Sequence, residues 1–404
     1  MSLCALITGA NSGLGYALCC RLIDEFLDTR PDSAILTLII TTRDQRKSVS
    51  TVNRLKSLRR VSSSDRVRFQ PEILDLTSIK SVQSLASKLR QSNSRIDAIL
   101  LNAGIGGWLG VNWPVAIYGL LTHWTEAVTW PEFKKSAIGW VTKPQLPAKN
   151  IAKDQAEPPL GEVFCANVFG HYLLAHYLTP LLSPDDEHPD PGRIIWLSSL
   201  EAYEHTLSLD DFQAINNSAA YEASKRITDL LVLTSELPST KRYIEQYLPA
   251  QPPPKMYLSH PGVCSTGIFP LPWILGFCMT AAFYIARWLG SMWHTCKPYT
   301  GACAPAWLAL APQATLDSME SRNGKGKWGS ATDWFGNGRV ARTEVEGWGY
   351  SGIVGVSSKG KRGRRRSARD LTKEDRENFE QAGVDCWKEM EALRTEWEAR
   401  VGTL

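Results

Sequence analysis

Short apolar runs alternate with amphipathic segments through the first hundred residues of the chain. The runs are rich in Leu, Ile, Val and Ala, as buried strands are, and most of the segments between them place apolar residues at helical spacing. Strands are predicted within 3–8, 35–41, 67–76 and 98–101, and helices within 14–27, 47–60 and 79–89. This alternation predicts βαβ units and a parallel sheet that is covered on both faces.

The alternation stops between residues 106 and 160. This stretch holds scattered Pro and Gly together with five tryptophans: Trp108, Trp113, Trp124, Trp130 and Trp140. A structureless loop of this length is unusual within a compact domain. We therefore expect an insertion that contains some helix and contacts the functional site.

The rhythm of strands and helices returns after the insertion. Helices are predicted at 161–181, 220–237 and 301–311, and strands at 193–197 and 256–259. Residues 318–358 are rich in Gly and aromatics and predict a late strand or an irregular cap, while 373–400 has the composition of a solvated helix. We expect one α/β domain over 1–315, which includes the insertion and an apolar segment at 263–296, and an irregular extension over 316–404.

Composition narrows the class of protein. With 43% hydrophobic and 21% charged residues the chain can bury a large core, and its net charge of +4 gives no case for a nucleic-acid partner. Nine cysteines, an odd number without a Cys-x-x-Cys pair, indicate reduced thiols, and we predict no metal site. The start of the chain lacks the features of a signal peptide, and Arg287 interrupts the nearest approach to a spanning helix, 271–293.

One local charge pattern departs from this average, the basic run over 359–369. Blocks of like charge are usually solvated and disordered, which is the simpler interpretation here. Contact with an anionic membrane surface is the alternative.

The first predicted strand runs into a glycine-rich turn. Its glycines have the spacing Gly-x-x-x-Gly-x-Gly, and a helical segment begins directly after them. Such glycines permit a tight turn and let the backbone approach a pyrophosphate, while the helix N-terminus offers free N–H groups. We predict a dinucleotide site, with an ordinary glycine-rich turn as the alternative. Its residues are Gly9, Asn11, Ser12, Gly13, Leu14 and Gly15.

The ends of the second and third strands carry the residues expected near the adenosine. Arg43 stands where an acidic residue would accept from a ribose hydroxyl, and a guanidinium there can pair with a 2′-phosphate. This favours NADP(H), and a solvated arginine is the alternative. Asp75 follows the third strand and either meets the adenine or caps the next helix.

Two further strand ends complete the predicted cofactor site. Asn102 either contacts the cofactor or braces neighbouring strands, and Thr266 is placed to bond the nicotinamide carboxamide. His260 is expected to be structural. The predicted contacts at these two strand ends are Asn102, Ala103, Gly104, Pro261, Gly262, Val263 and Thr266.

The candidate catalytic residues centre on Tyr221 and Lys225, which lie one helical turn apart on a common face. A neighbouring ammonium lowers a phenol pKa, which suits an acid that protonates a carbonyl oxygen. Ser199, at the end of a strand, is placed to bond the same oxygen, with Ser198 as its rival. Asn167, in the middle of a predicted helix, either anchors a proton relay or is a packing residue.

These motifs occur in the order found in the short-chain dehydrogenases/reductases, which the sequence resembles from about residue 3 to 266. The resemblance implies a Rossmann-like, doubly wound parallel sheet of about seven strands. It also implies that Ser199, Tyr221, Lys225 and Asn167 form the catalytic set.

A narrower resemblance is to the fungal 3-keto-sterol reductases of ergosterol biosynthesis. It rests on the opening 7–15, the Trp-rich insertion and the segment 164–174. It implies NADPH-dependent reduction of the C-3 ketone of a sterol during C-4 demethylation. It further implies that the protein works beside the other demethylation enzymes, on the cytosolic face of the endoplasmic reticulum and on lipid droplets. The spacing from Ser199 to Tyr221 and the basic run depart from the family pattern.

The segment 268–293 lies where these enzymes keep their substrate-binding loop. Tryptophans towards both ends and Arg287 suit an amphipathic helix in a membrane interface, and a buried core helix or dimer contact is the alternative. Two other functions stay open: reduction of another lipophilic carbonyl, such as a retinal-like compound or a secondary metabolite, and a scaffold role in the sterol demethylation complex.

Overall fold

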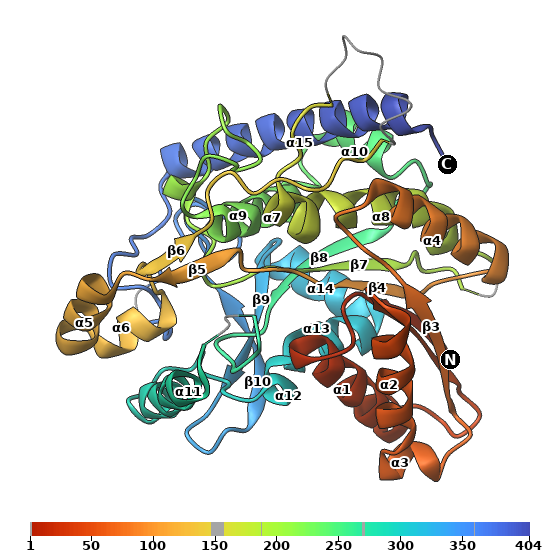
Figure 1. The fold of residues 1–404 in the computed structure, drawn as a ribbon, viewed down its shortest axis with the longest axis horizontal. Coiled ribbons are helices and arrows are strands. Elements are labelled where there is room, and N and C mark those ends of the chain that lie inside the picture. The colour runs from red at the N-terminus through yellow and green to blue at the C-terminus, as the bar shows by residue number, and fades with distance from the viewer. Residues whose placement is uncertain (1, 147–156, 187, 269–270, 359) are drawn as a thin grey trace.

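The computed structural model describes residues 2–146, 157–186, 188–268, 271–358 and 360–404. An eight-stranded sheet lies at its centre, with the order β10-β9-β8-β7-β4-β1-β2-β3, and only the β9–β10 pair is antiparallel (Figure 1). The order reverses between β1 and β4, so the predicted doubly wound α/β sheet is confirmed. The strands are β1 (Leu3–Ile7), β2 (Leu36–Thr42), β3 (Val67–Ile73), β4 (Ala98–Leu101), β7 (Arg193–Leu197), β8 (Lys255–His260), β9 (Lys327–Thr332) and β10 (Gly338–Thr343).

The C-terminal part extends the sheet. Residues beyond 315 supply β9 and β10, so the late strand that the sequence left open as one of two alternatives is present, and the sheet has eight strands rather than about seven. Every residue of β9 is buried, yet its sequence Lys-Trp-Gly-Ser-Ala-Thr is neither continuously apolar nor alternating. Such a sequence gives a weak strand signal, because its partners rather than its own pattern determine its conformation.

Helices cover both faces of the sheet in two separate cores (Figure 1). One face is covered by α4 (Ile79–Ser92), α7 (Glu162–Phe164), α8 (Gly170–Leu178) and α9 (Ala220–Leu233). The other is covered by α1 (Gly13–Thr29), α2 (Gln45–Lys56) and α13 (Cys303–Leu310), with α3 (Arg59–Ser62), α12 (Pro298–Gly301) and α14 (Gln313–Asn323) nearby.

The last helix, α15 (Lys373–Val401), forms an additional layer over α9 and α10 (Lys241–Tyr247). It begins with a capping box, in which Thr372 and Asp375 each accept a backbone N–H from the other. Its own side chains Trp387 and Trp397 are almost fully buried against the layer below, and its Glu391 accepts a hydrogen bond from Tyr172 at 2.6 Å. This helix closes the core on the α9 side of the sheet.

The described part of the insertion folds into a small antiparallel strand pair and two helices, of which the sequence predicted only the presence of some helix. These are β5 (Trp108–Val111), α5 (Trp113–Thr122), α6 (Trp124–Thr129) and β6 (Lys134–Ser136). Helix α11 (Trp273–Trp288) packs against α6, so the insertion and the late apolar segment lie side by side beyond the carboxyl ends of the strands (Figure 1). The part of the insertion at 147–156 lies outside the described residues.

Helices α5 and α11 present apolar side chains to the exterior. Trp273 is 83% exposed, Phe277 71%, Tyr118 68% and Leu121 81%. Helix α11 is therefore not the buried core helix that the sequence left open. Within the described residues, no helix combines the length and apolar character needed to cross a membrane.

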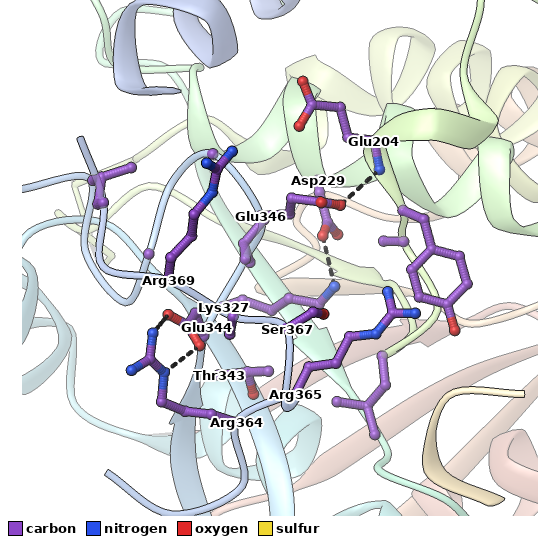
Figure 2. Close-up of a pocket in the computed structure, with 18 of the residues that line it drawn as sticks. Glu204, Asp229, Lys327, Thr343, Glu344, Glu346, Arg364, Arg365, Ser367 and Arg369 are labelled. Carbon is purple, nitrogen blue, oxygen red and sulfur yellow. Dashed lines mark hydrogen bonds and ion pairs between the residues drawn. The ribbon is translucent and has the colours of Figure 1, made fainter. Parts of the chain in front are cut away.

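The basic run is packed against the protein over part of its length. Arg364 forms a two-point ion pair with Glu344, as Figure 2 shows, and Arg365 pairs with Glu132 of the insertion. Trp293, beyond α11, donates a hydrogen bond to the carbonyl of Gly363 at 2.7 Å. The interpretation of a wholly solvated run is therefore wrong for these arginines. The sequence did not reveal their contacts because their acidic partners lie far away along the chain. Lys359 lies outside the described residues.

Candidate active site

The glycine turn after β1 requires its glycines. Gly9 and Gly13 have φ values of +69° and +53°, where side chains are disfavoured. A Cβ on Gly15 would lie 2.2 Å from the carbonyl oxygen of Gly9. The turn therefore holds the start of α1 directly against the end of β1, at the point where the strand order reverses.

A cleft of about 450 Å³ opens over this turn. Gly15 packs behind the turn, and Leu14 faces the neighbouring cavity described below. The predicted cofactor residues in the cleft wall are Gly9, Asn11, Ser12, Gly13, Arg43, Asp75, Ala103, Gly104 and Thr266.

Both residues that the sequence predicted near the adenosine, Arg43 and Asp75, line this cleft. Arg43 is exposed at the end of β2. Asp75 accepts hydrogen bonds from the backbone and the hydroxyl of Thr77, at 3.0 and 2.7 Å, in the turn before α4, but the residue that caps α4 is Ser78. Arg54, which the sequence did not single out, donates to the carbonyl of Asn11 at 3.2 Å and steadies the glycine turn from α2.

Asn102 braces two strands, which was one of its two predicted roles. Its side-chain amide donates to the carbonyl of Thr8 at 2.8 Å, and its backbone N–H donates to the Thr8 hydroxyl at 2.9 Å. The ends of β1 and β4 are thus tied together at the base of the cleft.

Tyr221 and Lys225 lie on the same face of α9, as predicted. The Tyr221 side chain is 9% exposed and is hydrogen-bonded by the hydroxyl of Ser199. The Lys225 ammonium lies 5.5 Å from the Tyr221 ring centroid and donates to the carbonyl of Leu197 at 2.8 Å. Tyrosine, serine and lysine therefore converge at the carboxyl end of β7.

The two neighbouring serines have different environments. Ser198 donates to the carboxylate of Asp229 at 2.5 Å, inside the core. Ser199 faces Tyr221, and its hydroxyl accepts from the backbone N–H of Glu201 at 3.1 Å. Ser199 is therefore the serine that is available to a substrate, and Ser198 is structural.

The ionisation of the pair differs from expectation. Burial raises the pKa of the Tyr221 phenol well above its usual value, Glu201 adds to this, and the hydrogen bond from Ser199 opposes it only in part. Burial lowers the pKa of Lys225 to about 8, and Lys327 acts in the same direction. The phenol pKa is therefore raised overall rather than lowered as expected, because desolvation outweighs the effect of the neighbouring ammonium.

Asn167 lies in a π-helical turn, Cys165–Phe169, between α7 and α8. Its amide donates to the carbonyl of Ile105 and to the hydroxyl of Ser224, both at 3.0 Å, and its side-chain oxygen accepts from the N–H of Ile105. Such turns recur at functional sites. Here Asn167 joins the segment after β4 to α9, and its role in a proton relay stays a prediction.

The segment after β8 closes the other side of the site. Gly262 has a φ of +69°. Thr266 lines both the cleft over the glycine turn and a second cavity, which is described next. His260 bonds the N–H of Gly262 and the hydroxyl of Thr343, and burial keeps its pKa well below the usual value. His260 is therefore structural, as predicted.

A second cavity, of about 460 Å³, continues from the cofactor cleft towards α5 and α11. Tyr221, Ser199 and Lys225 lie in its wall, with the predicted residues Leu14, Asn102, Pro261, Gly262 and Val263. The cavity is otherwise lined mainly by apolar side chains of the insertion and α11: Trp113, Ala116, Leu120, Trp124, Val128, Phe133, Leu271, Leu275, Met279 and Phe283.

Several charged residues of the site were not found from the sequence. Lys327 of β9 is almost completely buried and donates to Asp229 at 2.6 Å, as Figure 2 shows. It also donates to the Ser199 carbonyl at 2.6 Å. Lys134 of the insertion and Glu201 form an ion pair in the cavity wall. No sequence motif marks these residues, because each comes from a segment that only the fold brings to Tyr221.

All nine cysteines are free thiols. Across the described residues, no cluster of His, Cys, Asp or Glu is arranged to hold a metal ion.

The fold, the glycine turn and the serine–tyrosine–lysine arrangement together define a short-chain dehydrogenase/reductase. The chain is 47% identical to the 3-keto-steroid reductase erg27 of Aspergillus fumigatus, over 97% of this chain and 93% of the relative. It is 39% identical to the corresponding reductase of Gibberella zeae, over 98% of this chain and 94% of the relative. The chain belongs to the 3-keto-steroid reductase family of fungi.

Other comparisons add less. No family model matches the chain. An active-site complex of RhlG with NADP from Pseudomonas aeruginosa is 18% identical, with a TM-score of 0.43 over 78% of this chain and 92% of that chain. A metagenomic short-chain oxidoreductase in complex with NADP gives 17% identity and a TM-score of 0.40, over 77% of this chain and 92% of that chain. Sequence identities and TM-scores this low support no conclusion about function.

Proposed function

We propose that the protein reduces the C-3 ketone of a sterol intermediate to the 3-hydroxyl, with NADPH, during C-4 demethylation in ergosterol biosynthesis. The observation that carries this proposal is the position of Tyr221 and Ser199 in the wall of an apolar cavity that opens into the glycine-lined cleft. A sterol has a large apolar body and one polar end, so it matches such a cavity.

The residues of the cleft fit an NADPH molecule. The glycine turn leaves room for a pyrophosphate at the N-terminus of α1, and Arg43 is exposed where a 2′-phosphate would lie. Thr266 stands between cleft and cavity, where it can bond a carboxamide. When bound, NADPH supplies the hydride that reduces the ketone carbon.

Tyr221 and Ser199 act on the ketone oxygen. Both hydroxyls donate to it and polarise the carbonyl, and Tyr221 transfers its proton as the oxygen gains negative charge. Burial keeps the phenol protonated at neutral pH, which suits an acid. Lys225, next to Tyr221, stabilises the phenolate that remains.

The experiment is NADPH oxidation by the purified protein with a 3-keto-4-methylsterol, compared with retinal and with NADH. We expect turnover of the sterol with NADPH, and little with retinal or NADH. Turnover of retinal at an equal or higher kcat/KM would instead identify a reductase for another lipophilic carbonyl. A protein that binds NADPH but turns over neither ketone would support the scaffold role.

We also propose that the protein docks on lipid through the outer faces of α5 and α11, at the cytosolic face of the endoplasmic reticulum and on lipid droplets, beside the other C-4 demethylation enzymes. Each helix lines the cavity with one face and exposes apolar side chains on another. A sterol could thus enter from the lipid that these helices contact.

Liposome flotation tests the docking. We expect wild-type protein to float with phosphatidylcholine–phosphatidylserine vesicles and the double variant Trp273→Glu/Phe277→Glu to stay in the soluble fraction. The charge-matched control places two glutamates at the exposed polar positions Ser84 and Gln91 of α4. Equal flotation of the α11 variant and the wild type would overturn the docking proposal.

A further inference from the structure

The insertion sends a lysine into the catalytic cavity. Lys134 lies on β6 and its side chain is 9% exposed. Its ammonium lies 3.9 Å from the Trp108 ring centroid and 5.3 Å from the Tyr221 ring centroid. The Tyr221 ring is thus approached by two ammonium groups at almost equal distance, that of Lys134 and that of Lys225 at 5.5 Å.

Two carboxylates hold this lysine in place. Glu201, in the segment after β7, forms an ion pair with Lys134, and Glu222 of α9 lies 3.1 Å from the ammonium. Their side chains are 17% and 7% exposed. One cation and two carboxylates from three separate elements therefore meet beside Tyr221, in a cavity that is otherwise largely apolar.

The cluster is linked to the reacting hydroxyls. The backbone N–H of Glu201 donates to the hydroxyl of Ser199, which in turn bonds Tyr221. The Trp108 ring lies between the insertion and Tyr221, with the two ring centroids 4.7 Å apart. Any movement of β5 or β6 would therefore change the charge that Tyr221 experiences.

We propose that Lys134 and Glu201 are positioning residues that set the proton affinity of Tyr221, and that through them the insertion controls the acid strength of the catalytic tyrosine. This proposal rests on the proposed reductase function. It gives the insertion a role beyond lining the cavity, because Lys134 reaches Tyr221 only when the β5–β6 strand pair lies over the site.

The ionisation of the cluster agrees with the geometry. Burial raises the pKa of Glu201 to about 7, Glu222 adds to this, and Lys134 opposes it. Glu201 and Glu222 in turn raise the pKa of Tyr221. The other titratable groups that face Tyr221 are Lys225 of α9 and Cys264 after β8, whose pKa burial raises to about 12.

The reverse reaction tests the proposal, because oxidation of the 3-hydroxysterol with NADP⁺ requires the Tyr221 phenolate. With saturating NADP⁺, whose positively charged nicotinamide would lower the phenol pKa, kcat/KM for the hydroxysterol should rise with pH through that lowered pKa. Glu201→Gln removes a negative charge and should move this rise to lower pH by on the order of one unit. Lys134→Met removes a positive charge and should move it to higher pH, while Lys134→Arg should stay near wild type.

Controls separate charge from folding. NADPH affinity should be near wild type for Glu201→Gln, which keeps the shape of the side chain, and its thermal unfolding should occur at no lower temperature than that of the wild type. If the rise keeps its position in both variants while kcat falls, or moves in the same direction in both, the residues are only structural and the proposal is wrong.

An assay without turnover separates this proposal from the proposed function. Infrared difference spectra of the protein alone should contain a protonated-carboxyl band that titrates near pH 7 and is absent from Glu201→Gln. Absence of this band from the wild type would overturn the inference. Presence of the band with no sterol turnover would instead overturn the proposed function.

Discussion

Removal of the Lys327 ammonium is the perturbation whose magnitude follows most directly from the structure. Lys327 and Asp229 have side chains only 3% and 1% exposed, and they pair at 2.6 Å. In Lys327→Met the side chain keeps much of its volume, but the buried Asp229 carboxylate loses its ion-pair partner and, among the described residues, keeps the Ser198 hydroxyl as its hydrogen-bond donor. The Ser199 carbonyl also loses its donor.

The expected cost is large. Breaking a buried ion pair by removing one partner destabilises a protein by ~3–5 kcal/mol, because the remaining charge is uncompensated. We expect the free energy of unfolding of Lys327→Met to fall by this amount, which is a large share of the ~5–15 kcal/mol typical of a whole domain.

Urea denaturation followed by circular dichroism measures the change, with an unchanged slope m as the check that the unfolded state is the same. Lys241→Met is the matched control, because the Lys241 side chain is 74% exposed, and it should cost less than ~0.5 kcal/mol. The double variant Lys327→Met/Asp229→Leu should recover at least half of the loss. A single variant within ~1 kcal/mol of wild type, or a double variant no better than the single one, would refute the reasoning.

Three further predictions concern the cofactor cleft and the buried carboxylate. Gly15→Ala places a Cβ 2.2 Å from the Gly9 carbonyl, so NADPH affinity measured by fluorescence quenching should fall at least about tenfold; unchanged affinity would contradict the tight turn. Arg43→Ala should raise the KM for NADPH about tenfold or more and leave that for NADH unchanged, and an equal effect on both would exclude a 2′-phosphate contact. Burial raises the pKa of Glu201 to about 7, so this carboxyl ionises less readily in the folded than in the unfolded protein. The wild type therefore loses stability as the pH rises from the pKa of the unfolded state to about 7. Relative to wild type, Glu201→Gln should therefore gain stability between about pH 4.5 and 7, by at most ~3 kcal/mol, and a pH-independent difference in denaturation would contradict this pKa.

The sequence predicted the parts of the fold that follow local patterns. Strands β1, β2, β4, β7 and β8 correspond to apolar runs of ordinary strand length in the sequence. The spacing of the glycines in the turn after β1 admits few conformations. Strand β9 differs, because a lysine, a glycine and small polar residues become a buried strand only through their neighbours.

The same distinction applies to the candidate site. Tyr221 and Lys225 are one helical turn apart, so a sequence pattern can pair them. Lys134 and Glu201 are 67 residues apart and lie in segments without periodicity, so no local rule brings them together. The arginines of the basic run likewise pair with acidic residues of the insertion and of the segment after β10. The composition of the run alone therefore predicts a solvated segment.

The most direct measurement is NADPH oxidation with a 3-keto-4-methylsterol by the wild type and by Tyr221→Phe, together with NADPH affinity and thermal unfolding of both. The variant lacks only the hydroxyl that donates the proton, so turnover should fall by at least about a hundredfold while fold and NADPH affinity are kept. Turnover by Tyr221→Phe at the wild-type rate would contradict the assignment of Tyr221 as the acid.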